Sequence, residues 1–146
     1  MNPVHFSSAT DDWATPQDFF DKLNAEFSFT LDVCASDGNA KCERYFTARD
    51  DGLSKPWAGI CWMNPPYGRG IDRWMRKAYE SARDGATVVC LVPARTDTRW
   101  WQTYATQGEV FFVPGRLKFG DAKANAPFPC AVVTFRPQVS WALKKD

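Results

Sequence analysis

The alternation of apolar and polar residues divides the chain into short strands and amphipathic helices. An unbroken apolar run at 87–92 predicts a strand buried on both faces of a parallel sheet. A shorter apolar run at 60–63 predicts another strand, which ends at an asparagine and two prolines. Between the two runs, apolar residues recur at helical spacing from Ile71 to about Arg83, and Gly70 and Gly85 flank this helix. On its polar face, an i,i+4 pair is expected between Asp72 and Arg76.

The N-terminal part of the pattern predicts a helix followed by a strand. Thr15 stands at the N-cap position of the helix and Pro16 at its first turn, and apolar residues follow at 19, 20, 23 and 27. Residues 27–33 then have the composition of a strand. This strand leads into the small residues Cys34, Ala35 and Ser36, which would allow a ligand to approach the backbone closely.

The C-terminal part predicts a short helix at about 98–107 and two strands at 109–113 and 130–135. The short helix contains Trp100 and Trp101, which we do not expect both to face the interior of a one-sided helix. A loop at 114–129 joins the two strands, and loops of this length in compact domains are usually functional or disordered.

Composition bounds the class of protein. A chain of 146 residues, with 45% hydrophobic and 24% charged residues, is typical of one globular domain. We expect that domain at 13–136, after a flexible arm at 1–12 and before a tail at 137–146. The five cysteines form no C-x-x-C pair and predict reduced thiols, and a single histidine makes a zinc site an unexpected feature. We find no signal peptide or long apolar segment and expect a cytoplasmic protein.

The candidate chemistry lies in the loop Asn64-Pro65-Pro66-Tyr67, which follows the strand at 60–63. In open α/β sheets, ligands bind at the carboxyl ends of strands. The Asn64 side-chain oxygen and the Pro65 carbonyl are two acceptors beside the aromatic ring of Tyr67. This set suits a planar substrate with an NH₂ group, whose hydrogens the acceptors bind while its ring stacks on tyrosine. The same four residues are also common in simple turns, so the motif alone leaves both interpretations open.

Asn-Pro-Pro-Tyr is the amine-positioning motif of amino-methyltransferases that use S-adenosylmethionine. From Ala14-Thr15-Pro16-Gln17, through residues 31–36, to Ala126-Pro127-Phe128-Pro129, the chain resembles the small phage-type DNA N6-adenine methyltransferases of the Dam-like group. The resemblance covers about residues 13–136. It implies transfer of a methyl group to the N6 amine of adenine in DNA, without a metal ion.

The resemblance also implies a fold and a set of cofactor-binding residues. The expected fold is α/β: a trimmed doubly wound (Rossmann-like) sheet, mostly parallel, with an antiparallel C-terminal strand. It is trimmed because residues 40–59 are too few for the two βα units that a complete methyltransferase would place there. The loop after residue 33 lacks the usual G-x-G pattern. The residues expected near the cofactor are Thr15, Pro16, Asp32, Cys34, Ala35, Ser36, Asp50 and Asn64.

Two of these assignments have alternatives. Asp32 is expected to reach the amino-acid end of the cofactor, but a strand-end carboxylate also caps turns. Either Asp50 or Asp51 would accept hydrogen bonds from the adenine or ribose, and a solvated turn at these two residues is an equally good interpretation.

We expect DNA as the macromolecular partner, either as a duplex with an everted adenine or as a single strand. Basic and aromatic side chains in the loops around the motif are the candidate contacts. They are Arg69, Arg95, Arg99, Trp100, Arg116, Lys118, Phe119 and Phe128. In related enzymes, an aromatic residue of the loop at 114–129 packs against the everted base. The net charge of +1 neither requires nor excludes a local basic face.

Other functions remain open from the sequence. The same motif serves methylation of cytosine N4 and of a glutamine side-chain amide in proteins. The missing glycine pattern also leaves a nucleic-acid binder without cofactor as a hypothesis. No room remains for a target-recognition domain, so we expect recognition of a short site. A monomer and a homodimer are both compatible with the sequence.

Overall fold

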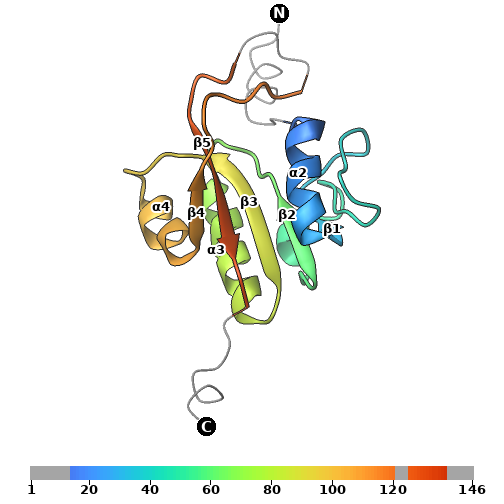
Figure 1. The fold of residues 1–146 in the computed structure, drawn as a ribbon. Coiled ribbons are helices and arrows are strands. Elements are labelled where there is room, and N and C mark those ends of the chain that lie inside the picture. Colours follow the sequence, from blue (N-terminus) through green and yellow to red (C-terminus); the bar gives the residue numbers. More distant parts are fainter. Residues whose placement is uncertain (1–13, 121–124, 138–146) are drawn as a thin grey trace, which may run out of the picture.

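The protein is described by a computed structural model that covers residues 14–120 and 125–137. Its five strands form one open sheet in the order β1-β2-β3-β5-β4 (Figure 1). The strands are β1 (Leu31–Asp32), β2 (Ile60–Met63), β3 (Thr87–Pro93), β4 (Glu109–Phe112) and β5 (Cys130–Phe135). Strands β1, β2 and β3 are parallel, whereas β5 lies antiparallel between β3 and β4. The predicted α/β class is confirmed, with an open sheet that begins parallel.

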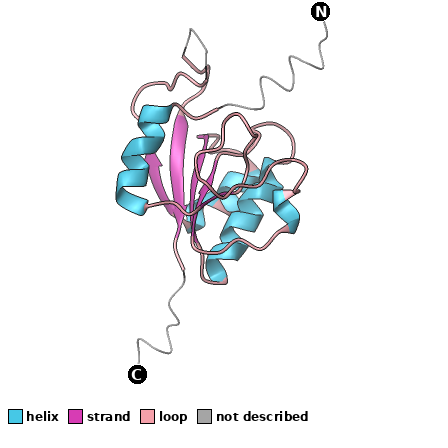
Figure 2. Ribbon diagram, turned by 90° about the vertical axis from the view of Figure 1, so that its right-hand side faces the viewer, coloured by secondary structure: helices cyan, strands magenta, loops and turns pink. Residues whose placement is uncertain are grey.

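Helices cover both faces of this sheet. The helical segments are α2 (Gln17–Phe27), η1 (Gly52–Ser54), α3 (Ile71–Arg83), α4 (Arg99–Thr103) and η2 (Ala105–Gln107). Figures 1 and 2 show α2 on one side of the sheet and α3 and α4 on the other. Within the described ranges, no helix is long and apolar enough to cross a membrane. The predicted N-terminal arm and nearly all of the predicted tail lie outside the described residues.

The core lies around the two central strands. After the first residue of β3, every residue of β3 and β5 is buried, as expected for strands covered on both faces. The helix α3 has the predicted bounds, and its buried face includes Ile71 and Met75. The i,i+4 ion pair on its polar face is not the predicted one, because Arg76 pairs with Glu80 at 3.0 Å. All five cysteines are free thiols, as predicted, but only Cys61, Cys90 and Cys130 are buried as the sequence also suggested, whereas Cys34 and Cys42 are half-buried.

The start of α2 differs from the prediction. The helix begins at Gln17, its N-cap residue is Pro16, and no side chain caps it. The hydroxyl of Thr15 instead accepts a hydrogen bond from the side-chain amide of Asn64, 49 residues further along the chain. The Thr15 hydroxyl, which the local sequence predicts as the N-cap of α2, therefore makes a tertiary hydrogen bond instead.

The strand predicted at 27–33 is much shorter in the structure. Phe27 is the last residue of α2, and Ser28 takes the left-handed conformation with a φ of 57°. The backbone carbonyl of Asn24 accepts a hydrogen bond from the amide of Ser28, and its side-chain oxygen accepts one from the amide of Phe29. Ser28 and Phe29, which the sequence assigned to a strand, therefore belong to the C-terminal cap of α2. Only Leu31–Asp32 pairs with β2 as a ladder.

Both tryptophans of α4 are buried, which contradicts the expectation that one of them is exposed. Trp100 is 8% exposed and Trp101 is 4% exposed. The ring of Trp101 stacks on Phe112 of β4 at a centroid distance of 6.2 Å. A short helix that lies against both a neighbouring helix and the edge of a sheet buries more than one face, so the one-sided assumption fails here.

Candidate active site

The candidate site lies where the parallel strands end. The carboxyl ends of β1, β2 and β3 lie at one edge of the sheet, so the loops that begin at Val33, Asn64 and Ala94 are neighbours. Strand β2 ends at Met63, because two prolines follow Asn64 and cannot donate ladder hydrogen bonds. The stiff loop then holds Asn64 at the end of a buried strand.

The side-chain amide of Asn64 has a partner at each end. Its Nδ2 donates to Thr15 Oγ1 at 2.9 Å. Its Oδ1 accepts from the Tyr67 hydroxyl at 2.6 Å, and that hydroxyl also lies 3.1 Å from the carbonyl oxygen of Leu91. An amide oxygen has two lone pairs, so Oδ1 can accept a second hydrogen bond in addition to the one from tyrosine.

Tyr67 does not present an open ring face in this structure. Its side chain is 1% exposed, and burial raises the pKa of its hydroxyl well above 10.0, so the hydroxyl stays a donor at neutral pH. Phe119 and Phe128 contact the ring edge-on, with centroid distances of 5.9 Å and 5.7 Å. Phe119 and Phe128 were expected to pack against the substrate base. In this structure they pack against Tyr67, the residue on which that base is expected to stack.

Arg95 contacts two other segments of the site. Its Nη1 donates to the backbone carbonyl of Tyr67 at 3.0 Å, and its guanidinium lies 5.7 Å from the centre of the Phe128 ring. The side chain remains exposed to solvent. Arg95 thus joins the loop after β3 to the loop after β2 and to the segment before β5.

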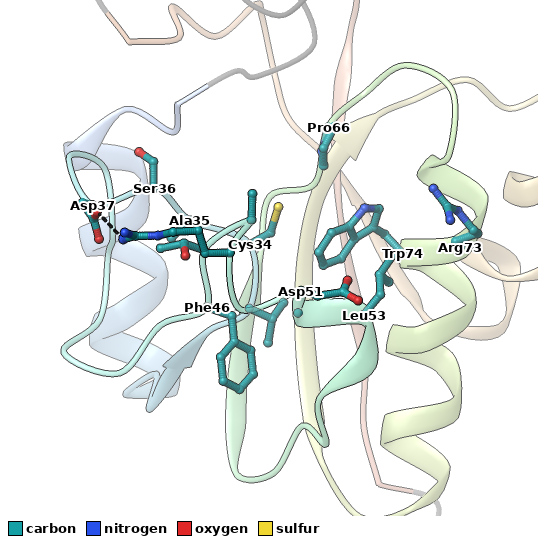
Figure 3. Close-up of a pocket in the computed structure, with 15 residues that line it drawn as sticks. Cys34, Ala35, Ser36, Asp37, Phe46, Asp51, Leu53, Pro66, Arg73 and Trp74 are labelled. Atoms are coloured by element: carbon teal, nitrogen blue, oxygen red, sulfur yellow. Dashed lines mark hydrogen bonds and ion pairs between the residues drawn. The ribbon is translucent and has the colours of Figure 1, made fainter.

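A cavity of about 660 Å³ lies beside this loop (Figure 3). Figure 3 shows Cys34, Ala35 and Ser36 along one side of it, and Pro66 and Trp74 on the other. The remaining lining residues come mostly from the segment between β1 and β2, together with Arg73 of α3, and only Asp51 among them was predicted near the cofactor. They are Val33, Asp37, Phe46, Thr47, Ala48, Arg49, Asp51, Gly52, Leu53 and Arg73.

A much smaller pocket, of about 10 Å³, adjoins the large cavity at Cys34, which lines both. Thr15, Asp32 and Asn64 are among its lining residues. The carboxylate of Asp32 accepts hydrogen bonds from the backbone amides of Cys34 at 3.2 Å and Lys41 at 3.0 Å. Its burial raises the pKa from 3.8 to about 6, and these hydrogen bonds oppose the shift. Asp32 therefore caps a turn and also faces a pocket.

Most of the sequence-predicted cofactor residues line one of the two spaces, and two do not. Pro16 caps α2 and lines neither pocket. Asp50 is also outside, because its carboxylate accepts from the backbone amide and hydroxyl of Thr47, and these hydrogen bonds lower its pKa. The neighbouring Asp51 lines the cavity instead. Sequence reasoning missed Trp74, because helical spacing placed it in the buried stripe of α3.

The residues predicted to contact DNA differ in their exposure to solvent. Trp100 is buried, so it is not the exposed stacking residue that the sequence suggested. Phe119 is also buried, at 3% exposed, in contact with Tyr67. The basic candidates are all exposed, and they are Arg69, Arg95, Arg99, Arg116 and Lys118. In the described ranges, no group of three or more His, Cys, Asp or Glu residues is placed to hold a metal ion.

Comparison with known proteins decides the family. Residues 5–137 match the family described as DNA N-6-adenine-methyltransferase (Dam). The chain belongs to this family. It is 29% identical, over 95% of its length and 86% of the relative, to the DNA N-6-adenine-methyltransferase of Haemophilus phage HP1. It is 31% identical to the protein of that name from Escherichia phage T1, over 62% of this chain and 39% of the relative.

Family membership makes the chain a DNA adenine-N6 methyltransferase and confirms the resemblance drawn from its motifs. It favours adenine in DNA over the cytosine and glutamine acceptors that the tetrapeptide alone left open. The role of each residue in the site is a separate question, which rests on the geometry above.

Proposed function

We propose that this chain binds S-adenosylmethionine in the 660 Å³ cavity and transfers its methyl group to the N6 amine of an everted adenine held at Asn64 and Pro65. The observation that carries the proposal is the position of the cavity, which opens beside Pro66 at the carboxyl ends of parallel strands. The sheet order and the antiparallel β5 support a trimmed, doubly wound methyltransferase fold.

The lining residues fit this cofactor. The cavity volume lies within the range of about 300–1,000 Å³ that is usual for ligand pockets. Phe46 and Trp74 offer apolar walls for an adenine ring, and Asp51 offers acceptors for its amine or for ribose hydroxyls. Asp32, in the adjoining pocket, is a carboxylate suited to the positive amino group of the methionine end.

When bound, S-adenosylmethionine supplies a methyl group made electrophilic by its sulfonium. The residues of this chain orient the acceptor. The side-chain oxygen of Asn64 and the Pro65 carbonyl would accept the two hydrogens of the adenine amine, which directs the nitrogen lone pair out of the ring plane. As positive charge develops on that nitrogen, the two oxygens stabilise it. The new N–C bond would form as the S–C bond of the sulfonium breaks and leaves a neutral thioether, and the methylated nitrogen would then lose one proton to water; no covalent bond to the protein is needed.

Base binding in this site needs a rearrangement of aromatic side chains. Stacking on Tyr67 requires Phe119 or Phe128 to give up its contact with that ring, because both now cover it. The displaced phenylalanine could then pack against the base, so the stacking energy lost by Tyr67 is largely replaced. Unstacking a base from duplex DNA costs a few kcal/mol, which these contacts offset.

The exposed basic residues around the site would bind DNA phosphates. We propose Arg69, Arg99, Arg116 and Lys118 for this role, with Arg95 contributing its remaining donors. Such contacts position the duplex but do not read its sequence. We therefore propose recognition of a short target, with base contacts from the loops at 94–101 and 114–129.

Methylation with tritium-labelled S-adenosylmethionine tests the proposal. Purified protein is incubated separately with DNA, RNA and bulk protein, and the labelled DNA is digested to nucleosides. We expect label in DNA as N6-methyladenine, and calorimetry should show binding of the cofactor. Label in protein alone, or no cofactor binding at saturating concentrations, would contradict the proposal.

A further inference from the structure

The hydroxyl of Thr15 has an unusual position for a residue next to a helix start. Thr15 is 4% exposed and precedes α2, yet its oxygen makes no capping bond. It accepts instead from Asn64 Nδ2 at 2.9 Å, across the small pocket that both residues line. The segment before α2 is thereby joined to the loop after β2.

This contact bears on which end of the Asn64 amide faces the substrate. An amide rotated by 180° would place its NH₂ where its oxygen should be, and an NH₂ group cannot accept the hydrogens of another amine. The distances fit the orientation with the oxygen toward Tyr67. The 2.6 Å contact to the tyrosine hydroxyl is typical of O–H···O bonds, and the 2.9 Å contact to Thr15 is typical of N–H···O bonds.

We propose that Thr15 is a positioning residue that keeps the Asn64 carbonyl oxygen turned toward the amine of the substrate base. This inference rests on the proposed role of Asn64. Tyr67 alone does not hold the amide, because its hydroxyl could accept from a rotated amide while it donates to the Leu91 carbonyl. The hydroxyl of Thr15 can also donate or accept, so the orientation follows from the two contacts together. A rotated amide would place its NH₂ 2.6 Å from the Tyr67 oxygen, which is shorter than N–H···O bonds usually are, and Thr15 holds the other end of the amide at 2.9 Å.

Two other roles for Thr15 make different predictions. If Thr15 served mainly to bind the cofactor, removal of its hydroxyl would raise the Kd for S-adenosylmethionine and leave kcat at saturation unchanged. If it served only to pack the start of α2, removal would lower thermal stability without a specific effect on kcat. A positioning role predicts a lower kcat with little change in either binding constant.

The test compares Thr15→Val, which keeps the shape and removes the oxygen, with Thr15→Ser, which keeps the oxygen. In Thr15→Val we expect kcat to fall by about 10- to 100-fold, as for loss of one buried hydrogen bond at a reacting group. The KM for DNA and the Kd for S-adenosylmethionine should change by less than about threefold, since both ligands bind through many other contacts. Thr15→Ser should restore most of the kcat, and Thr15→Ala replaces Thr15→Val if the latter fails to fold.

A matched control removes another threonine hydroxyl near the opposite end of β2. Thr30 Oγ1 accepts from the backbone amide of Ile60 at 3.1 Å, so Thr30→Val should affect stability without the kcat effect. An unchanged kcat in Thr15→Val, or a Thr15→Ser variant as impaired as Thr15→Val, would overturn the proposal.

A readout independent of activity separates this inference from the proposed function. The side-chain amide signal of Asn64 in a ¹⁵N spectrum, assigned by its loss in Asn64→Ala, should shift in Thr15→Val and keep its position in Thr15→Ser. A signal that stays in place in Thr15→Val contradicts the orienting role, even in an active enzyme. If the Asn64 signal shifts in Thr15→Val but the wild-type protein does not methylate adenine, the proposed function is wrong, whereas the hydrogen bond between Thr15 and Asn64 is confirmed.

Discussion

At the scale of single residues, the site depends on polar groups whose partners lie far away in sequence. Asn64 was identified from its local motif, because an asparagine between a strand end and two prolines has a recognisable pattern. Its partner Thr15 was assigned to a helix cap, since nothing local reveals a contact 49 residues away. The choice between Asp50 and Asp51 was likewise beyond the sequence, because hydrogen bonds within a turn engage Asp50 and leave Asp51 for the cavity.

The buried carboxyl of Asp32 predicts a pH-dependent stability. Its folded-state pKa of about 6 is above the unfolded value of 3.8, so the folded protein holds the proton more tightly. Its contribution to stability is therefore fully present below about pH 4 and is lost as the pH rises through 6. We expect wild type to lose about 2 kcal/mol in free energy of unfolding relative to Asp32→Asn between pH 4 and pH 7.

Urea unfolding of both proteins at several pH values measures this difference, and groups that the two share cancel. Two backbone amides bind the Asp32 carboxylate, so the substitution also changes the absolute stability of the variant. Only the change with pH tests the argument. A difference that stays constant, or that grows in favour of wild type as the pH rises, would contradict it.

At the scale of elements, the sequence predicted those segments whose pattern is local. The helix at 71–83 and the buried strands at 60–63 and 130–135 were predicted with their observed bounds, and β3 extends one residue further than expected. The prediction failed where a neighbour decides the outcome. Strand β1 is short because Asn24 extends the preceding helix cap, and α4 buries both tryptophans because Phe112 of β4 lies against one of them.

The short helix η1 offers a test of the cavity wall. A Cβ atom added at Gly52 would clash with the backbone carbonyl oxygen of Val33, at a separation that real Cβ atoms essentially never show. In Gly52→Ala, η1 must therefore move away from the end of β1, and these segments form two sides of the cavity. We expect a loss of about 1–3 kcal/mol of stability, together with weaker binding of S-adenosylmethionine by calorimetry.

Gly38→Ala is the control for this substitution, because an added Cβ at Gly38 meets no atom within 4 Å. It should bind the cofactor as wild type does. Wild-type cofactor affinity in Gly52→Ala would show that this wall is not part of the cofactor site.

At the scale of the whole molecule, the fold places three loops at one edge of a small sheet. The parallel order of β1, β2 and β3 brings the predicted cofactor loop beside the Asn-Pro-Pro-Tyr loop, and β5 returns antiparallel with the aromatic segment that covers Tyr67. The class of the fold followed from the succession of strand and helix patterns. The burial of Tyr67 did not, because it depends on Phe119 and Phe128, more than fifty residues away in the chain.

The most direct test of the account is the methyl-transfer rate of Asn64→Ala, measured in single turnovers at saturating S-adenosylmethionine and DNA. Asn64 lies at the surface of the small pocket and is partly buried, so the variant should fold and bind the cofactor nearly as wild type does. We predict that methylation of adenine falls below detection, because the amine loses the acceptor that orients it. Methylation at a rate near that of wild type would contradict the central role given to this side chain.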